Sequence, residues 1–164
     1  MRVIHIRRAG SMDTRQMAEL LNTIIEKGGT TAKTEKVSLT DLERYIRHYS
    51  GRNAWFLAED DVGSVLGFQY IEPNESLPSD AADIATFVKI GETGHGIGSK
   101  LFERTKLAAH DLGYAWINAT IRADNTGGLA YYQSRGFEDY ATQENVKLKD
   151  GSCVSKIKKR FNLR

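Results

Sequence analysis

The sequence has little of several features that would identify particular classes of protein. Its one cysteine, Cys153, excludes a disulfide within the chain, and a lone cysteine is typical of a reducing compartment. No stretch approaches the roughly 18 apolar residues needed to span a bilayer. The start, Met-Arg-Val-Ile-His-Ile-Arg-Arg, predicts no signal peptide. We therefore expect a cytoplasmic protein without a membrane partner.

An excess of charge of one sign is also lacking. The formal net charge is +2 over 164 residues, so composition does not favour nucleic-acid binding. The basic residues near the C-terminus alternate along an expected strand, and we interpret them as a solvated face: Lys156, Lys158, Lys159, Arg160 and Arg164. The chain is long enough for one hydrophobic core and contains no linker, so we expect a single domain over residues 1–164.

Apolar residues recur with the periods of strands and helices along the whole chain. The expected strands cover residues 2–7, 54–58, 64–71, 81–89, 115–121, 137–147 and 153–161. The expected helices cover residues 13–27, 40–49, 97–112 and 124–135. This order predicts an α/β fold with a mixed, mostly antiparallel sheet and helices on both of its faces.

Local signals mark the ends of these elements. Asp13 with Gln16, and Thr40 with Glu43, have the spacing of a capping box at a helix start. An Asp-Gly pair at 150–151 favours a hairpin between the last two strands. The third helix should bury one stripe of residues: Ile97, Leu101, Phe102, Thr105, Ala108, Ala109 and Leu112.

The segment Thr-Gly-His-Gly-Ile-Gly-Ser-Lys at 93–100 links the fourth expected strand to the third helix. Its glycines lack a Cβ, so the backbone can turn sharply and approach a ligand closely. The first turn of a helix presents unpaired N–H groups and about half a positive charge. These features favour an anion site suited to a pyrophosphate. The alternative is a turn that only caps the helix.

Two well-known phosphate-binding loops do not fit this segment. A Walker loop ends in Gly-Lys-Ser/Thr, whereas this segment reads Gly98-Ser99-Lys100. A Rossmann fingerprint follows the first strand and has an acidic residue about 20 positions on. Here the turn follows the fourth expected strand, so both of these nucleotide-binding folds are excluded.

Several spaced residues resemble the GNAT superfamily of acetyltransferases. Its signature, V-x-x-x-x-[RQ]-x-x-G-x-[GA], is followed by an asparagine after the next strand and a tyrosine four residues before a Gly-Phe pair. The matching residues here are Val88, Thr93, Gly96, Gly98, Asn125, Tyr132, Gly136 and Phe137. The pattern is most similar to the phosphinothricin and methionine-sulfone N-acetyltransferase branch, which acts on L-amino acids. The resemblance implies the GNAT fold, with a sheet splayed between its fourth and fifth strands.

The resemblance implies an enzyme that transfers an acetyl group from acetyl-CoA to the primary amine of a small acceptor, an amino acid or an amine. The amine would attack directly in a ternary complex, without a metal and without an acyl-enzyme. Cys153 is accordingly interpreted as a packing residue. Homodimers are common in the branch. Two alternatives stay open, a protein N-terminal or lysine acetyltransferase and a non-catalytic acyl-CoA-binding module.

The residues implied for binding acetyl-CoA lie at the end of the fourth strand, in the glycine turn and near the fourth helix. They are Phe87, Val88, Lys89, Thr93, Gly94, His95, Gly96, Ile97, Gly98, Ser99, Asn125 and Tyr132. Thr93 stands where the family prefers Arg or Gln, so backbone N–H groups should hold the pyrophosphate, with His95 as an added donor or simply a solvent-facing loop residue. Asn125 would bind the pantetheine arm, cap the next helix, or do both.

The implied chemistry needs a neutral amine, a donor for the developing oxyanion and an acid for the leaving thiolate. By resemblance, the Val88 N–H is the oxyanion donor and Tyr132 is the general acid; the alternative for Tyr132 is a core aromatic. Tyr131, the next residue on the helix, should point elsewhere. Asp83 and Glu72 are candidate bases, acting through a water or holding the ammonium, or are ordinary strand-end charges.

The acceptor should enter over the first two helices and the loop at 73–80. Thr30, Thr31, Trp55 and Glu72 are its expected contacts. An enzyme for amino acids needs a closed pocket with a cation for the acceptor carboxylate, and Arg122 or Lys89 are the candidates. An enzyme for peptides needs an open groove.

Overall fold

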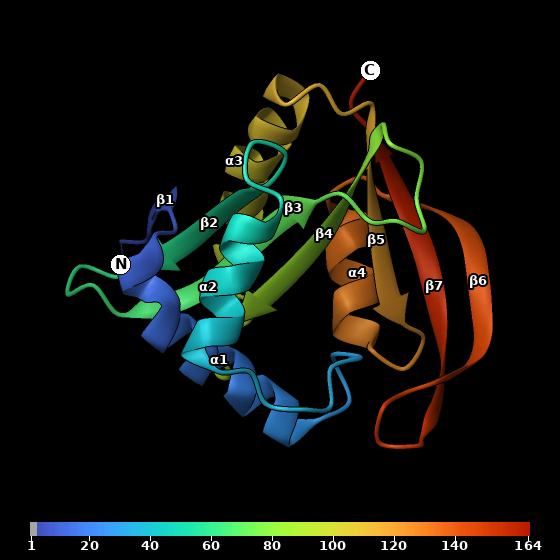
Figure 1. Cartoon of the computed structure of the whole chain (residues 1–164), viewed down its shortest axis with the longest axis horizontal. Coiled ribbons are helices and arrows are strands. Elements are labelled where there is room, and N and C mark those ends of the chain that lie inside the picture. The colour runs from blue at the N-terminus through green and yellow to red at the C-terminus, as the bar shows by residue number, and fades with distance from the viewer. Residues whose placement is uncertain (1–2) are drawn as a thin grey trace.

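The computed structural model describes residues 3–164 (Figure 1). Its strands are β1 His5–Arg8, β2 Ala54–Glu59, β3 Val65–Glu72, β4 Ala81–Val88, β5 Trp116–Arg122, β6 Glu138–Lys147 and β7 Cys153–Asn162. Its helices are the short 3-10 turn η1 Ser11–Asp13, then α1 Thr14–Lys27, α2 Leu39–His48, α3 Ile97–Asp111 and α4 Thr126–Ser134. The predicted order of elements is confirmed. The strand predicted over residues 2–7 corresponds to β1, and its predicted first residue lies outside the described residues.

The strands form one sheet in the order β1-β2-β3-β4-β5-β7-β6. Every neighbouring pair is antiparallel except β4 and β5, which are parallel. The mixed, mostly antiparallel sheet is therefore confirmed. None of the described helices is long and apolar enough to cross a membrane.

Each face of the sheet is covered by its own hydrophobic core. Figure 1 shows α1 and α2 in front of the sheet, with α3 behind it. The front core joins Met17 and Leu21 of α1 and Leu42 of α2 to sheet residues such as Phe68. The rear core packs the apolar stripe of α3 against the other side of β2 to β5 and continues to Tyr132 of α4. Alternation of side chains along each strand supplies both cores at once.

The predicted capping box of the first helix is wrong. Gln16 does not reach back to Asp13; its Oε1 accepts from the Val65 N–H at 3.0 Å and ties α1 to the start of β3. Asp13 instead accepts from the Gly10 N–H at 2.7 Å and from the Arg7 guanidinium. For Gln16, the distant Val65 N–H thus takes the place of the predicted local partner, Asp13.

The second capping box is also wrong, by two residues. Ser38 precedes α2 and accepts from the Asp41 N–H at 3.0 Å, while Asp41 accepts from the Ser38 N–H at 3.0 Å. Thr40 and Glu43 have a similar spacing, so the motif alone does not place the helix start. Here the helix begins earlier, at Leu39.

Three residues in the second half of the chain differ from the predictions in how far they are buried. Leu112 is 37% exposed because α3 ends at Asp111, and Cys153 is exposed at the start of β7 rather than packed. Lys159 is only 4% exposed and donates to Asp139. It shares a strand face with Phe161, which packs on the rear core, so the C-terminal basic residues do not form one solvated face.

The stripe of α3 gives a stability prediction with an internal control. Leu101 is fully buried, whereas Leu107 on the same helix is 61% exposed. We expect Leu101→Ala to lower the free energy of unfolding by about 2–5 kcal/mol, since the cavity cannot fully collapse. Leu107→Ala should change it by less than about 0.5 kcal/mol. Urea denaturation measures both, and equal losses would contradict this assignment of the core.

Candidate active site

The site is organised by the place where β4 and β5 separate. Their parallel pairing joins only residues 81–83 to residues 116–118. Beyond that point β4 stays paired with β3 as far as Val88, while β5 pairs with β7 over its whole length. The splay implied by the family resemblance is therefore confirmed.

The separation leaves one edge of β4 without a neighbouring strand. The Lys89 N–H donates to the Leu66 carbonyl at 2.8 Å, so this residue faces β3. In an antiparallel ladder, alternate residues direct their backbone groups to the same neighbour. The N–H and C=O groups of Thr86 and Val88, which lie beyond the paired residues 81–83, consequently face the gap on the β5 side.

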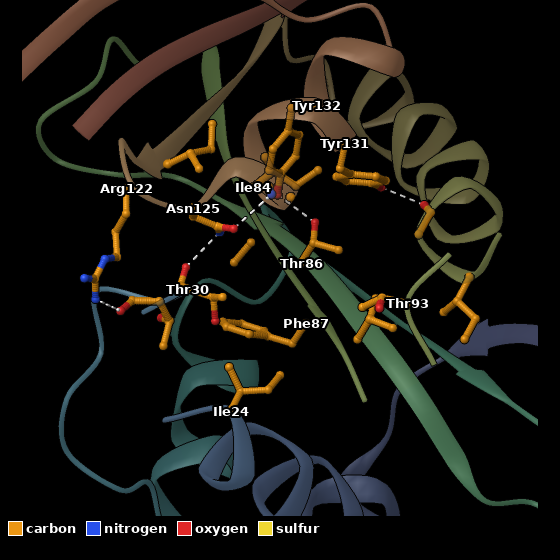
Figure 2. A pocket seen from close by; sticks show the side chains of 18 of the residues that line it. Ile24, Thr30, Ile84, Thr86, Phe87, Thr93, Arg122, Asn125, Tyr131 and Tyr132 are labelled. Carbon is orange, nitrogen blue, oxygen red and sulfur yellow. Dashed lines mark hydrogen bonds between the residues drawn. The ribbon is translucent and has the colours of Figure 1, made fainter. Parts of the chain in front are cut away.

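A cavity of about 950 Å³ fills this gap (Figure 2). It extends from the glycine turn along β4 to Asp83, with the loop after α1, the end of β5 and α4 as its other walls. The predicted site residues that line it are Thr30, Thr31, Asp83, Phe87, Val88, Thr93, Gly94, Gly96, Ile97, Gly98, Ser99, Asn125 and Tyr132. Residues from the loop after α1, from β4, from the glycine turn with the start of α3, and from α4 with its N-cap thus meet in one cavity.

Four of the predicted site residues do not line this cavity: Trp55, Glu72, Lys89 and His95. Trp55 is 3% exposed and stacks on Tyr70, which does line it, with ring centroids 3.8 Å apart. Glu72 pairs with Asp83 across β3 and β4. The His95 side chain is 57% exposed, with Nδ1 3.4 Å from Glu92. Its position matches a solvent-facing loop residue.

The turn before α3 has the backbone geometry of a close-approach loop. Gly94 and Gly96 have φ angles of 84° and 80°, which glycine adopts without a steric cost. At Gly98, a Cβ would lie 2.7 Å from the ring of Tyr131. The first residues of α3, Ile97 to Ser99, line the cavity, and N–H groups in the first turn of a helix have no intrahelical acceptor. This end of the cavity is suited to an anion.

Asn125 uses its side chain twice. Its Oδ1 accepts from the Gly128 N–H at 2.9 Å and so caps α4, as one alternative predicted. Its Nδ2 donates to the Thr30 carbonyl at 3.0 Å, and Arg122 donates to the Thr31 carbonyl at 3.1 Å. Figure 2 shows both links between the loop after α1 and the end of β5. They hold that loop in place as a wall of the cavity.

Asp83 lines the end of the cavity where the strands part, and Glu72 lies beside it on β3. Asp83 accepts from Asn118 Nδ2 at 3.0 Å and from Asn74 Nδ2 at 3.1 Å. Burial raises the pKa of Asp83, and these two bonds oppose the rise. Burial, with the charge of Asp83 beside it, raises the pKa of Glu72 to about 7. Both carboxyls are therefore stronger bases than exposed ones.

Three lysines in the lining, Lys27, Lys33 and Lys156, were not predicted as site residues. Lys33, from the loop after α1, is half-buried, and this burial lowers its pKa. Lys156 of β7 lines the cavity because it pairs with Arg122 of β5. Arg122, a predicted cation for the acceptor, instead binds Asp124 at 2.8 Å and the Thr31 carbonyl. Only the pairing of β5 with β7 could have revealed Lys156.

Both tyrosines of α4 line the cavity. Their ring centroids are 4.9 Å apart, and the two hydroxyls go to different walls (Figure 2). The Tyr131 hydroxyl donates to the Gly98 carbonyl at 2.7 Å. The Tyr132 hydroxyl lies 2.7 Å from Thr86 Oγ1, and burial raises the pKa of Tyr132. Tyr132 therefore stays protonated at neutral pH.

The family assignment agrees with this geometry. The acetyltransferase (GNAT) family matches the chain over residues 17–137, more than half of its length. The matched stretch includes the glycine turn and Tyr132. The protein belongs to the GNAT family and is an acetyltransferase.

Individual relatives are distant in sequence and close in fold. YwnH of Bacillus subtilis (strain 168), provisionally named a phosphinothricin acetyltransferase, is 24% identical over 148 residues, which cover 89% of this chain and 91% of YwnH. The Salmonella typhimurium acetyltransferase yncA, whose function is also provisional, was solved with its cofactor acetyl-CoA. The two structures align with a TM-score of 0.88 at 21% identity. The alignment covers 99% of this chain and 95% of yncA.

A third relative has a different kind of acceptor in its name. The ribosomal-protein-alanine N-acetyltransferase of Brucella melitensis has a TM-score of 0.87 at 22% identity, over 96% of this chain and 99% of its own. Likeness at this level shows the fold. Since these relatives are named for different acceptors, the acceptor of this enzyme must be inferred from its own cavity.

The raised pKa of Glu72 predicts a pH dependence of stability. Folding moves this pKa from 4.5 to about 7, so the folded protein holds the proton more tightly than the unfolded chain. The stability that Glu72 contributes is therefore full below pH 4.5 and is lost as the pH rises through 7. We expect Glu72→Gln to gain stability relative to the wild type over this range in urea denaturation. A difference that stays constant with pH would contradict the shift, and Glu75→Gln, at an exposed position, is the control.

Proposed function

We propose that this acetyltransferase transfers the acetyl group of acetyl-CoA to the primary amine of a small acceptor, an amino acid or an amine. The amine attacks directly in a ternary complex. The observation that supports this most is the continuous cavity, which has an anion-binding turn at one end and Asp83 with three lysines in its lining. Residues 1–164 act as one catalytic domain in this proposal.

The part of the cavity near α3 fits acetyl-CoA. The first-turn N–H groups of Ile97, Gly98 and Ser99 offer donors for its pyrophosphate. Thr93 carries no charge, so these backbone groups hold the phosphates. The open edge of β4 offers N–H and C=O groups to the amides of the pantetheine arm, which can pair there as an added strand does. Bound acetyl-CoA supplies an activated thioester.

Two groups of the protein act on charge that develops during transfer. The Val88 N–H faces the gap and serves as the donor for the oxygen that gains negative charge. Tyr132 gives its hydroxyl proton to the leaving sulfur. The acceptor ammonium releases two protons over the reaction; one restores Tyr132 and the other goes to solvent. The raised pKa of Tyr132 ensures that it holds a proton to give.

Asp83 is the carboxylate that serves the acceptor amine. It lines the cavity, whereas Glu72 lies beside it outside the lining. Two amide donors, from Asn118 and Asn74, fix its orientation. Asp83 holds the ammonium or takes its proton through a water, and its raised pKa improves it as a base.

The walls of the cavity favour a small acceptor with an anionic group. The loop at Thr30 and Thr31 is tied to the end of β5 by Asn125 and Arg122 and forms one side wall of the cavity. Lys27, Lys33 and Lys156 are the lysines in the lining that can meet an acceptor carboxylate, because Arg122 is committed to Asp124 and Lys89 lies outside the lining. A free amino acid combines the amine and carboxylate that this pocket fits.

We also propose a cytoplasmic location and a homodimer. The lone Cys153 is typical of a reducing compartment, which supports the location. The dimer rests on the resemblance to the L-amino acid branch.

Thiol release from acetyl-CoA over a panel of amino acids, simple amines and short peptides tests the proposed function. We expect turnover to be fastest with free amino acids, and Lys156→Met to lower kcat/KM for them by about 10-fold, a factor typical of one lost charged contact. The same variant should leave kcat/KM unchanged for amines that lack a carboxylate, and Lys147→Met, on an exposed residue, is the matched control. Faster turnover of peptides than of amino acids would contradict the small-acceptor proposal.

A further inference from the structure

Gln69 of β3 is a fully buried polar residue that the proposed reaction does not yet use. Its Nε2 donates to Thr86 Oγ1 at 2.9 Å and to the Tyr131 hydroxyl at 3.0 Å. Its Oε1 is buried and has no hydrogen-bond partner among the described residues. Burying an amide with an unpaired oxygen costs stability that an apolar side chain would not cost. This cost suggests that Gln69 serves the neighbouring site.

The donors and acceptors around Gln69 can be assigned by starting from the Gly98 carbonyl, which bonds Tyr131. The Gly98 carbonyl can only accept, so the single proton of Tyr131 goes to it, at 2.7 Å. The Tyr131 oxygen is then an acceptor for Gln69. This fixes the Gln69 amide with its nitrogen, rather than its oxygen, toward both Tyr131 and Thr86.

The Thr86–Tyr132 pair has two possible directions, because either hydroxyl can be the donor. Thr86 Oγ1 accepts from Gln69 and has its own proton to donate to the Tyr132 oxygen 2.7 Å away. In this direction Tyr132 accepts from Thr86 and keeps its own proton for the cavity. In the opposite direction the Tyr132 proton would point at Thr86 and away from a substrate.

We propose that Gln69 and Thr86 are positioning residues that orient the Tyr132 hydroxyl so that its proton faces the cavity. The inference rests on the proposed role of Tyr132 as general acid. The Tyr132 O–H bond breaks and an S–H bond forms on the leaving thiol, while Thr86 keeps its proton and donates a hydrogen bond to the phenolate that remains. No proton moves along the chain of side chains. The same series of hydrogen bonds also links Tyr132 to Gly98 of the anion-binding turn.

A double-mutant cycle tests this dependence. We expect Tyr132→Phe to lower kcat by about 100-fold, as loss of a general acid does, and Thr86→Val to lower it by about 10-fold. Because Thr86 acts through Tyr132, the double variant should match Tyr132→Phe within about 2-fold. KM for acetyl-CoA should stay within about 3-fold throughout. Thr86→Ser keeps the hydroxyl and should restore most of kcat.

Gln69→Met separates orientation from folding. Methionine has a similar shape and removes the unpaired Oε1, so the thermal midpoint should be unchanged or higher. We expect kcat to fall by about 5-fold or more at the same time, because the Thr86 hydroxyl is then free to turn. A purely structural role for Gln69 would instead lower the midpoint and leave kcat near that of the wild type.

The outcomes of the cycle are distinct. If Thr86→Val lowered kcat by the same factor in the wild type and in the Tyr132→Phe variant, the positioning proposal would be overturned, since Thr86 would then act independently of Tyr132. A slow Tyr132→Phe variant beside a fully active Thr86→Val variant would overturn it too and leave the acid assignment intact. A fully active Tyr132→Phe variant would overturn both the acid assignment and this proposal.

Discussion

The end of backbone pairing between β4 and β5 is the constraint on which the rest of the site depends. β4 and β5 pair only over residues 81–83 and 116–118, while β5 stays paired with β7 along its whole length. At the fork, Asn118 donates to both Asp83 and Thr120 and accepts from Tyr140. These side-chain bonds satisfy polar groups where the ladder ends. The gap that opens beyond them provides both the cavity and a free strand edge.

The remaining walls fix groups around that gap from distant parts of the chain. The glycine turn places the start of α3 at one end, and the close contact of Tyr131 with Gly98 joins α4 to it. Asn125 and Arg122 hold the loop after α1 on the other side. Each wall is thus held by hydrogen bonds outside the sheet. The chemistry proposed here uses groups whose positions those bonds set.

Much of this arrangement could be predicted because its signals are local or match a family pattern. The order of elements follows from apolar periodicity, and the residues at 93–99 are consecutive, so the turn and its place at the cavity follow from the sequence. The second capping box failed because Ser38 with Asp41 and Thr40 with Glu43 are overlapping candidates. Local spacing cannot choose between them.

The residues that sequence analysis missed depend on the pairing of distant strands. Lys156 enters the cavity through its register with β5, and Lys33 through a loop held by other elements. Gln69 occupies a position in β3 that a strand pattern marks only as buried; its meaning appears once Thr86 and Tyr131 are beside it. Such positions become visible only when the register of β3 with β4 is known.

Amide hydrogen exchange along β4, measured by NMR with and without acetyl-CoA, tests the central claim most directly. The amides of Phe87 and Lys89 face β3 and should be protected in both states. Those of Thr86 and Val88 face the gap and should exchange readily in the free protein, then slow by about 10-fold or more when acetyl-CoA pairs with this edge. Unchanged exchange at Thr86 and Val88 with saturating acetyl-CoA would contradict the account.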